Sequence, residues 1–266
     1  LLLVEKRPFF PRIIEYNGES FQWLQKLGFN TVALKHQPTA DQIVTAKRLG
    51  MWLIVPPKAL SAGHSWQTIR DRCLAFDLGN NLTQDDLPAI SQTVSSIRDL
   101  ESPNVPLLAA SPVTMLNSYS RQCDLLRLPW APLYQSADLN AATRSLREHI
   151  GQLRHGTSYW VTIPTQPSPA LISQWNAFGT RHLFPREVEP EQIRFLAFSA
   201  VASGARGLYF RSWSRLDAPD TSTGIRCNTL ELVNQEIRLI EPWLAGGVYL
   251  GDLDTGAADV RGSLWQ

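Results

Sequence analysis

The sequence has few cysteines and no metal-binding histidine pair, and these shortages exclude several kinds of site. Cys73, Cys123 and Cys227 lie far apart and show no Cys-x-x-Cys spacing, so we expect three buried free thiols rather than a zinc site or a catalytic thiol. His149 and His155 are six positions apart, which is not the helical spacing of two zinc ligands. We therefore expect no metal and no cofactor.

The sequence also lacks an excess of charge and a long apolar run. Its 25 basic and 24 acidic residues are interspersed and leave a net charge of +1, whereas a nucleic-acid-binding chain carries a basic patch. No apolar run approaches the ~20 residues that cross a bilayer. We expect neither nucleic acid nor a membrane as a partner.

The pattern of strands and helices predicts an α/β protein. The phrases Lys26–Phe29 and Arg48–Met51 echo each other, and each leads from a helix through a glycine into a short apolar strand. Such repeats are typical of βα units in a parallel sheet. Eight strands are expected, at Phe9–Ile14, Thr31–Leu34, Trp52–Val55, Cys73–Leu78, Pro106–Ala110, Leu125–Leu128, Tyr159–Ile163 and Gly207–Phe210.

Eight strands in 266 residues favour a TIM (β/α)8 barrel, which we place at residues 1–244. A doubly wound open sheet is the alternative, although no glycine-rich phosphate-binding motif follows any strand. Helices are expected at Gln84–Leu100, at Ala137–Leu153, from Glu189 to Gly204, and in a last segment that ends at Pro242.

The end of the chain, residues 245–266, has the pattern of an extended segment. We interpret it as the start of a truncated β-rich domain, and the chain as a fragment whose partners include downstream β-rich domains of the same protein. A targeting signal would then lie outside the fragment. The compartment stays open, and a secreted or periplasmic location is compatible with the sequence.

Polar and aromatic residues gather at the expected strand ends, where a TIM barrel builds its site. The tryptophans Trp130 and Trp213 could stack on a sugar ring, or they could simply cover the barrel mouth. The polar candidates at these ends are Glu15, Tyr16, His36, Lys58, Asp77, Asn80, Asn81, Thr165, Gln166 and Arg211.

Two segments resemble a known family of glycoside hydrolases. Gly204–Trp213 (GARGLYFRSW) is similar to the last barrel strand of family 42 β-galactosidases and their clan A relatives, and Ile163–Pro169 (IPTQPSP) resembles their seventh strand. The resemblance implies a glycosidase-like TIM barrel with Thr165 at the position of the nucleophile. It also implies that Asn80 and Asn81 stand where the fourth strand carries Asn and the acid/base Glu, so both catalytic glutamates are replaced.

Three hypotheses follow, because glycoside hydrolysis usually needs two carboxyl groups. In the first, the barrel binds carbohydrate through the polar and aromatic candidates without two-glutamate hydrolysis. In the second, it is an active glycosidase whose displaced carboxylates are Asp77 and Glu15. In the third, it is a non-catalytic scaffold or interaction domain, and Asp77 is a structural anchor that pairs with Arg211 or a neighbouring loop.

Overall fold

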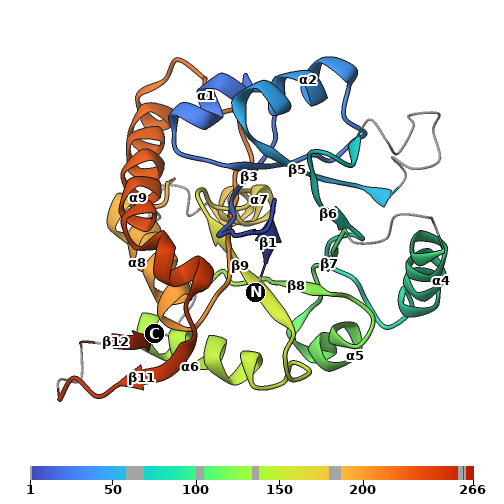
Figure 1. Ribbon diagram of the computed structural model, residues 1–266. Coiled ribbons are helices and arrows are strands. Elements are labelled where there is room, and N and C mark those ends of the chain that lie inside the picture. Colours follow the sequence, from blue (N-terminus) through green and yellow to red (C-terminus); the bar gives the residue numbers. More distant parts are fainter. Residues whose placement is uncertain are drawn as a thin grey trace.

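The computed structural model describes residues 2–57, 69–99, 105–133, 138–179, 187–256, 260 and 262–266. Eight parallel strands pair in chain order from β3 to β10, and β10 pairs with β3 to close a barrel. Figure 1 shows this ring of strands with helices around its outside. The predicted TIM barrel is confirmed, and the closure excludes the open sheet.

The barrel strands match the eight expected segments. They are β3 (Arg12–Glu15), β4 (Thr31–Ala33), β5 (Trp52–Val55), β6 (Cys73–Asp77), β7 (Leu107–Ala109), β8 (Leu125–Leu128), β9 (Ser158–Pro164) and β10 (Leu208–Arg211). Between them lie α1 (Phe21–Lys26), α2 (Ala40–Leu49), α4 (Leu87–Arg98), the 3-10 turn η2 (Val113–Met115), α5 (Leu116–Ser120), α6 (Leu139–Ile150), α7 (Pro169–Ala177) and α8 (Pro190–Ala202), and α9 (Thr221–Gly246) follows β10.

Local sequence signals explain where several helices begin and end. Thr39 and Gln42 form a capping box at the start of α2, which ends at Gly50 in a left-handed conformation with φ 67°. Helix α8 starts with Pro190, whose missing N–H is not needed in the first turn. These signals fix the residues at which the helices begin and end, and therefore where the next strand can start.

The expected end of the last helix at Pro242 is wrong, because α9 continues through it to Gly246. A proline removes one helical hydrogen bond, but tertiary contacts hold the following turn in place. Leu244 and Ala245 are buried, and Arg206 Nη1 donates to the carbonyls of Leu244 at 3.0 Å and Gly247 at 2.8 Å.

A short hairpin covers the amino-terminal end of the barrel. Its strands β1 (Leu3–Val4) and β2 (Arg7–Pro8) pair antiparallel. The side chains of Leu2, Val4 and Phe9 pack against the apolar cluster inside the barrel. This end of the barrel is therefore closed by apolar side chains, which leaves the carboxyl-terminal end for a site.

A second hairpin follows α9 and lies beside the barrel (Figure 1). Its strands are β11 (Tyr249–Leu253) and β12 (Gly262–Trp265). Arg147 of α6 forms an ion pair with Asp252, and the Arg206 guanidinium lies 4.8 Å from the ring centroid of Trp265. The extended segment expected at residues 245–266 is wrong at its start, because Ala245 and Gly246 belong to α9. The described residues from Tyr249 on include the two strands of a hairpin, and the assignment to a β-rich domain stays a prediction.

The alternation of side chains along each strand decides what fills the barrel. One apolar cluster inside the barrel consists of the buried residues Ile13, Ala33, Ile54, Leu74, Ala75, Leu108, Leu125, Trp160 and Tyr209. Residues two positions later on the same strand face the same side and lie closer to its carboxyl end. On five strands that position is polar, and the residues there are Glu15, Asp77, Arg127, Thr162 and Arg211.

Candidate functional site

Charged side chains meet inside the barrel, next to the apolar cluster. We call Glu15, Asp77, Arg127 and Arg211 the interior charge cluster, and Lys35, whose side chain is 54% exposed, pairs with Glu15 from its edge. Glu15 lies 3.1 Å from Lys35 Nζ through Oε1 and 3.6 Å from Arg211 Nε through Oε2. Asp77 Oδ2 lies 3.7 Å from Arg127 Nη2. Both candidate catalytic carboxylates therefore face the same end of the barrel, and each has a cationic partner.

Arg127 is the member of the cluster that the sequence reasoning missed. Its side chain is 0% exposed, and its guanidinium carbon lies 4.0 Å from the centroid of the Tyr209 ring. Within the described part of the chain, none of its three side-chain nitrogens has a hydrogen-bond acceptor. The signal in the sequence was a single arginine inside the apolar strand Leu125–Leu128 (LLRL), since a buried cation requires a partner.

Asp77 occupies an environment that disfavours its charged form. Burial is the main cause and raises the pKa of its carboxyl group, and the nearby Glu15 raises it further. The Arg127 guanidinium and the Gly79 N–H, which donates to Asp77 Oδ1 at 3.0 Å, act in the opposite direction. Asp77 thus pairs with Arg127 and accepts from the turn that follows β6, whereas Arg211, the partner expected from the sequence, pairs with Glu15.

Tyr209 lies beneath the charge cluster, where burial disfavours its phenolate form. Burial raises the pKa of its phenol to about 12, so the hydroxyl stays protonated at neutral pH. Some glycosidases use a tyrosine nucleophile, and the buried neutral phenol argues against that chemistry here. Its ring instead stacks under Arg127.

Thr165 and Gln166 follow β9, and their side chains bind the chain that follows β10. The Thr165 hydroxyl donates to the Arg211 carbonyl at 2.9 Å. Gln166 Oε1 accepts from the Trp213 N–H at 3.0 Å, and Gln166 Nε2 donates to Ser214 Oγ at 2.9 Å. Gln166 therefore positions the loop that carries Trp213.

A cavity of about 370 Å³ opens at the ends of β8, β9 and β10, and we call it the mouth pocket. Four predicted site residues line it: Trp130, Gln166, Arg211 and Trp213. Sequence reasoning missed Thr162, Pro164 and a wall formed by Pro167, Ser168, Ala170, Leu171 and Gln174. Because this wall belongs to the β9 loop and the start of α7, only the fold could place it there.

The remaining predicted residues lie apart from the mouth pocket. Tyr16 makes edge-to-face contacts with Phe21 and His36, with ring centroids 5.6 Å and 6.0 Å apart. Asn80 and Asn81 are exposed in the turn after β6, and Asn81 has a left-handed φ of 54°. Lys58 lies outside the described residues.

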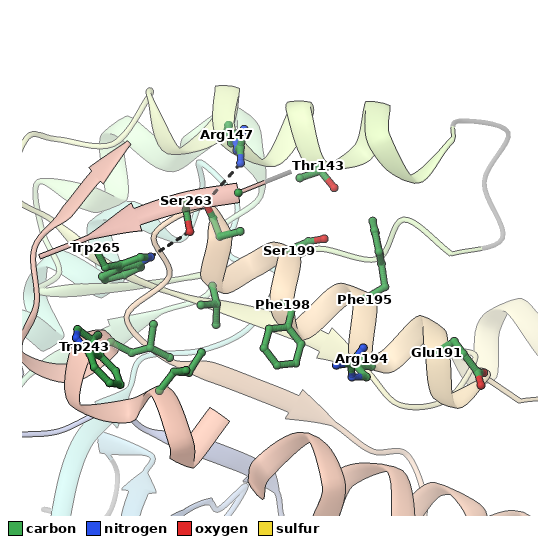
Figure 2. Close-up of a pocket in the computed structure, with 15 residues that line it drawn as sticks. Thr143, Arg147, Glu191, Arg194, Phe195, Phe198, Ser199, Trp243, Ser263 and Trp265 are labelled. Atoms are coloured by element: carbon green, nitrogen blue, oxygen red, sulfur yellow. Dashed lines mark hydrogen bonds between the residues drawn. The ribbon is translucent and has the colours of Figure 1, made fainter. Parts of the chain in front are cut away.

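A larger cavity of about 570 Å³ lies outside the barrel (Figure 2). Phe195 and Phe198 of α8 face Trp243 of α9 and Trp265 of β12 across it. Its arginines already have partners, since Arg147 pairs with Asp252 and Arg194 pairs with Glu236. Its lining residues come from α6, α8, α9 and β12, so the cavity lies away from the carboxyl ends of the barrel strands.

Other chemistries find no support in the described ranges. No group of three or more His, Cys, Asp or Glu side chains there could hold a metal ion. The three cysteines are free and buried, as expected, and burial raises the pKa of each thiol. No helix in the described segments has the length and apolar character needed to span a bilayer.

Comparisons at the sequence level find no match, either to a protein-family model or to a curated protein. Among solved structures the barrel is similar to β-glucuronidase from Ruminococcus gnavus in complex with D-glucuronic acid, with a TM-score of 0.53 at 12% identity over 78% of this chain and 42% of that one. The same enzyme with a C6-substituted uronic isofagomine gives 0.52 at 13% identity, covering 78% and 43%.

A third similar structure, a truncated 3-deoxy-D-arabino-heptulosonate 7-phosphate synthase from Thermotoga maritima, has a TM-score of 0.49 at 14% identity. The chain spans less than half the length of the glucuronidase. At 12% and 13% identity the likeness to the glucuronidase supports the barrel fold alone, and function has to be argued from the site.

Proposed function

We propose that the barrel binds carbohydrate in the mouth pocket. The observation that carries the proposal is the pairing of two tryptophans with polar groups in one cavity at the carboxyl ends of the strands. Trp130 and Trp213 offer flat apolar faces, while Arg211, Gln166 and Gln174 offer hydrogen-bonding groups. The cavity of about 370 Å³ has the size of a small-ligand site.

We further propose that this binding occurs without the usual two-glutamate hydrolysis. The residues at the two positions implied by the family resemblance are neutral. Thr165 and Gln166 are engaged in holding the end of β10 and its loop, and Asn80 and Asn81 carry no carboxyl group. A neutral amide or hydroxyl can bind a sugar hydroxyl but supplies neither general acid nor carboxylate nucleophile.

The first prediction tests the place of binding. Trp213→Ala should weaken the binding of a recognised sugar by about tenfold, because an indole face stacked on the ring is lost. Trp243→Ala is the matched control, since Trp213 and Trp243 are 41% and 55% exposed and Trp243 lines the cavity outside the barrel. A glycan array on the wild type selects the sugar, and titration calorimetry measures the affinities of the variants.

Three outcomes of this experiment distinguish the mouth pocket, the outer cavity and the scaffold hypothesis. Loss with Trp213→Ala alone supports the mouth pocket. Loss with Trp243→Ala alone would move the site to the outer cavity. An array with no bound glycan, followed by no binding at millimolar sugar, would reject the proposal and favour the scaffold hypothesis.

One observation favours the alternative of an active glycosidase with displaced carboxylates. A general acid needs a raised pKa, and burial raises that of Asp77. The prediction of this alternative is that Asp77→Asn abolishes turnover of chromogenic glycosides, with Asp71→Asn on the surface as the control. Our proposal expects no turnover above background by the wild type. If the wild type does hydrolyse the glycosides, equal turnover by Asp77→Asn would exclude Asp77 as a catalytic residue.

A further inference from the structure

Helix α9 presents an apolar stripe to solvent. Ile225, Leu232, Leu239 and Trp243 are 48%, 52%, 77% and 55% exposed. At 100° per residue these four positions lie within about 40° of one line along the helix, and we call them the α9 stripe. The opposite face of α9 already packs in the core, and Figure 1 shows the helix at the left edge of the molecule. The stripe is therefore apolar surface that the fold of one chain leaves unused.

The spacing of the stripe suits another helix. Ile225, Leu232 and Leu239 follow one another at intervals of seven residues, which is the period of helices that pack in pairs. From Ile225 to Trp243 the stripe runs about 27 Å along the helix. Single exposed apolar side chains are ordinary, but an aligned set of this length is typical of a surface that a partner helix covers.

Two opposite charges lie on one flank of the stripe, also seven residues apart. They are Glu231, whose Oε1 accepts from Gln235 Nε2 at 3.4 Å, and the exposed Arg238. In an antiparallel pair of α9 helices, Glu231 of one copy faces Arg238 of the second copy, and the reverse pair forms at the same time. A parallel pair would instead bring like charges to the same level. The flank therefore favours a second copy in antiparallel orientation.

The apolar positions follow the same symmetry as the charges. In a twofold pair, residue i meets residue j and j meets i, so matched residues lie at equal distances from the axis. Three pairs on the exposed face share a midpoint within about one residue of Gln235, namely Leu232 with Leu239, Glu231 with Arg238, and Ile225 with Trp243. The exposed face of α9 is thus complementary to itself about a single point.

One acidic residue lies within the stripe, close to this midpoint. Glu236 is held by Arg194 of α8, whose Nε donates to its two carboxylate oxygens at 3.1 Å and 2.8 Å. Its charge is therefore balanced within each copy, and the approach of a second copy does not bring an unpaired carboxylate to the axis.

From these observations we infer that the α9 stripe is the contact surface of a symmetric dimer, in which α9 of one copy packs antiparallel on α9 of a second copy. The inference goes beyond the proposed function and does not depend on carbohydrate binding. A single helix pair is small beside the roughly 800 Å² per partner of a standard interface, so we expect a dimer that dissociates at micromolar concentrations.

Sedimentation velocity of the whole chain, from micromolar to submillimolar concentration, tests the dimer and its surface. The wild type should pass from monomer to dimer over this range. Leu239→Glu should remain monomeric throughout, because it would bury an unpaired carboxylate in the contact. Val44→Glu is the matched control, since Val44 is 67% exposed on α2, and it should leave the dimer intact. Thermal unfolding of each variant shows that it is folded.

A charge exchange tests the pairing of the two flanking residues. Arg238→Glu and Glu231→Arg should each raise the dimer Kd about five- to thirtyfold, because two facing pairs become repulsive. The double variant, with both changes, restores opposite charges and should return the Kd to within about threefold of the wild type. A purely structural role of either residue would not give this recovery.

Cross-linking tests the orientation and the position of the axis. Gln235→Cys places a thiol near the axis, where it should form a disulfide with its own copy under mild oxidation, while the three native thiols are buried. Asn228→Cys, exposed on the same face, should not, because its two copies would lie about 20 Å apart along the helices and a disulfide needs Cα atoms within about 7 Å.

Each contrary result overturns a defined part of the inference. A wild type that stays monomeric at every concentration would overturn the dimer and leave the downstream domains expected from the sequence to cover the stripe. A dimer unaffected by Leu239→Glu would place the contact elsewhere. Cross-linking at both positions, or a double charge variant as weak as the single variants, would overturn the antiparallel arrangement.

Discussion

Arg127→Met should lower the free energy of unfolding by about 3–5 kcal/mol at neutral pH, the cost of removing one partner from a buried ion pair. Arg127 is fully buried and is the cation nearest to Asp77, at 3.7 Å. Methionine fills much of the same space but leaves the Asp77 carboxylate inside the barrel without its cation. Chemical denaturation, followed by circular dichroism, measures the change.

The destabilisation should depend on pH with a defined sign. The pKa of Asp77 in the folded state lies above its ordinary value of 3.8, so its contribution to stability is fully present below pH 3.8 and declines as pH rises through the folded-state pKa. Removing Arg127 removes a cause that lowers this pKa. The stability difference between wild type and Arg127→Met should therefore be larger at pH 8 than at pH 5.

A double variant shows whether charge or packing is responsible. Asp77→Asn in the Arg127→Met background replaces the unpaired carboxylate with a neutral amide and should recover a large part of the loss. The surface substitution Arg194→Met, which also removes an arginine, should cost less than about 1 kcal/mol. A double variant as unstable as Arg127→Met, with no dependence on pH, would show that lost packing dominates.

Gly28→Ala should lower the free energy of unfolding by about 2–4 kcal/mol. Gly28 has φ +87°, where an L-residue costs about 1 kcal/mol or more. An added Cβ would also lie 2.7 Å from Asn234 Cβ on α9, and overpacking of this kind costs about 1–3 kcal/mol. Equilibrium unfolding in denaturant measures the loss.

Gly50→Ala is the internal control for this prediction, because the two glycines end neighbouring helices in the echoed Leu-Gly phrases of the sequence. Gly50 has φ +67°, and an added Cβ meets nothing within 4 Å. It should therefore cost about 1 kcal/mol, from backbone strain alone. Equal losses at the two positions would show that the contact with Asn234 relaxes without cost.

The order of the barrel strands could be predicted because the repeated helix, glycine and short apolar strand is a local pattern. Its physical basis is the period of two in strands and the glycine that ends a helix. The end of α9 could not be predicted in the same way. Proline at position 242 is a local signal to stop, and it is overridden by the distant Arg206, which binds the carbonyls of Leu244 and Gly247.

The candidate site was predictable to the extent that it follows from strand ends. A TIM barrel builds its site at the strand ends, and this rule predicts Trp130, Gln166, Arg211 and Trp213 as site residues. These four residues line one pocket. Arg127 was missed because it lies within a strand rather than after one. Its pairing with Asp77 spans two strands, β6 and β8, that are not neighbours in the sheet, and no local pattern encodes such a contact.

The hairpin β11–β12 has a mechanical consequence. Its outermost hydrogen bonds join Val248 and Gln266 in both directions, at 2.7 Å and 3.0 Å. Val248 is also where the hairpin connects to α9. Tension applied at Gln266 would therefore load this pair first and break the hydrogen bonds between the two strands one pair at a time. The hairpin would extend under a low force before the closed barrel carries any load. The load would then reach the barrel through the last turn of α9, which Arg206 holds.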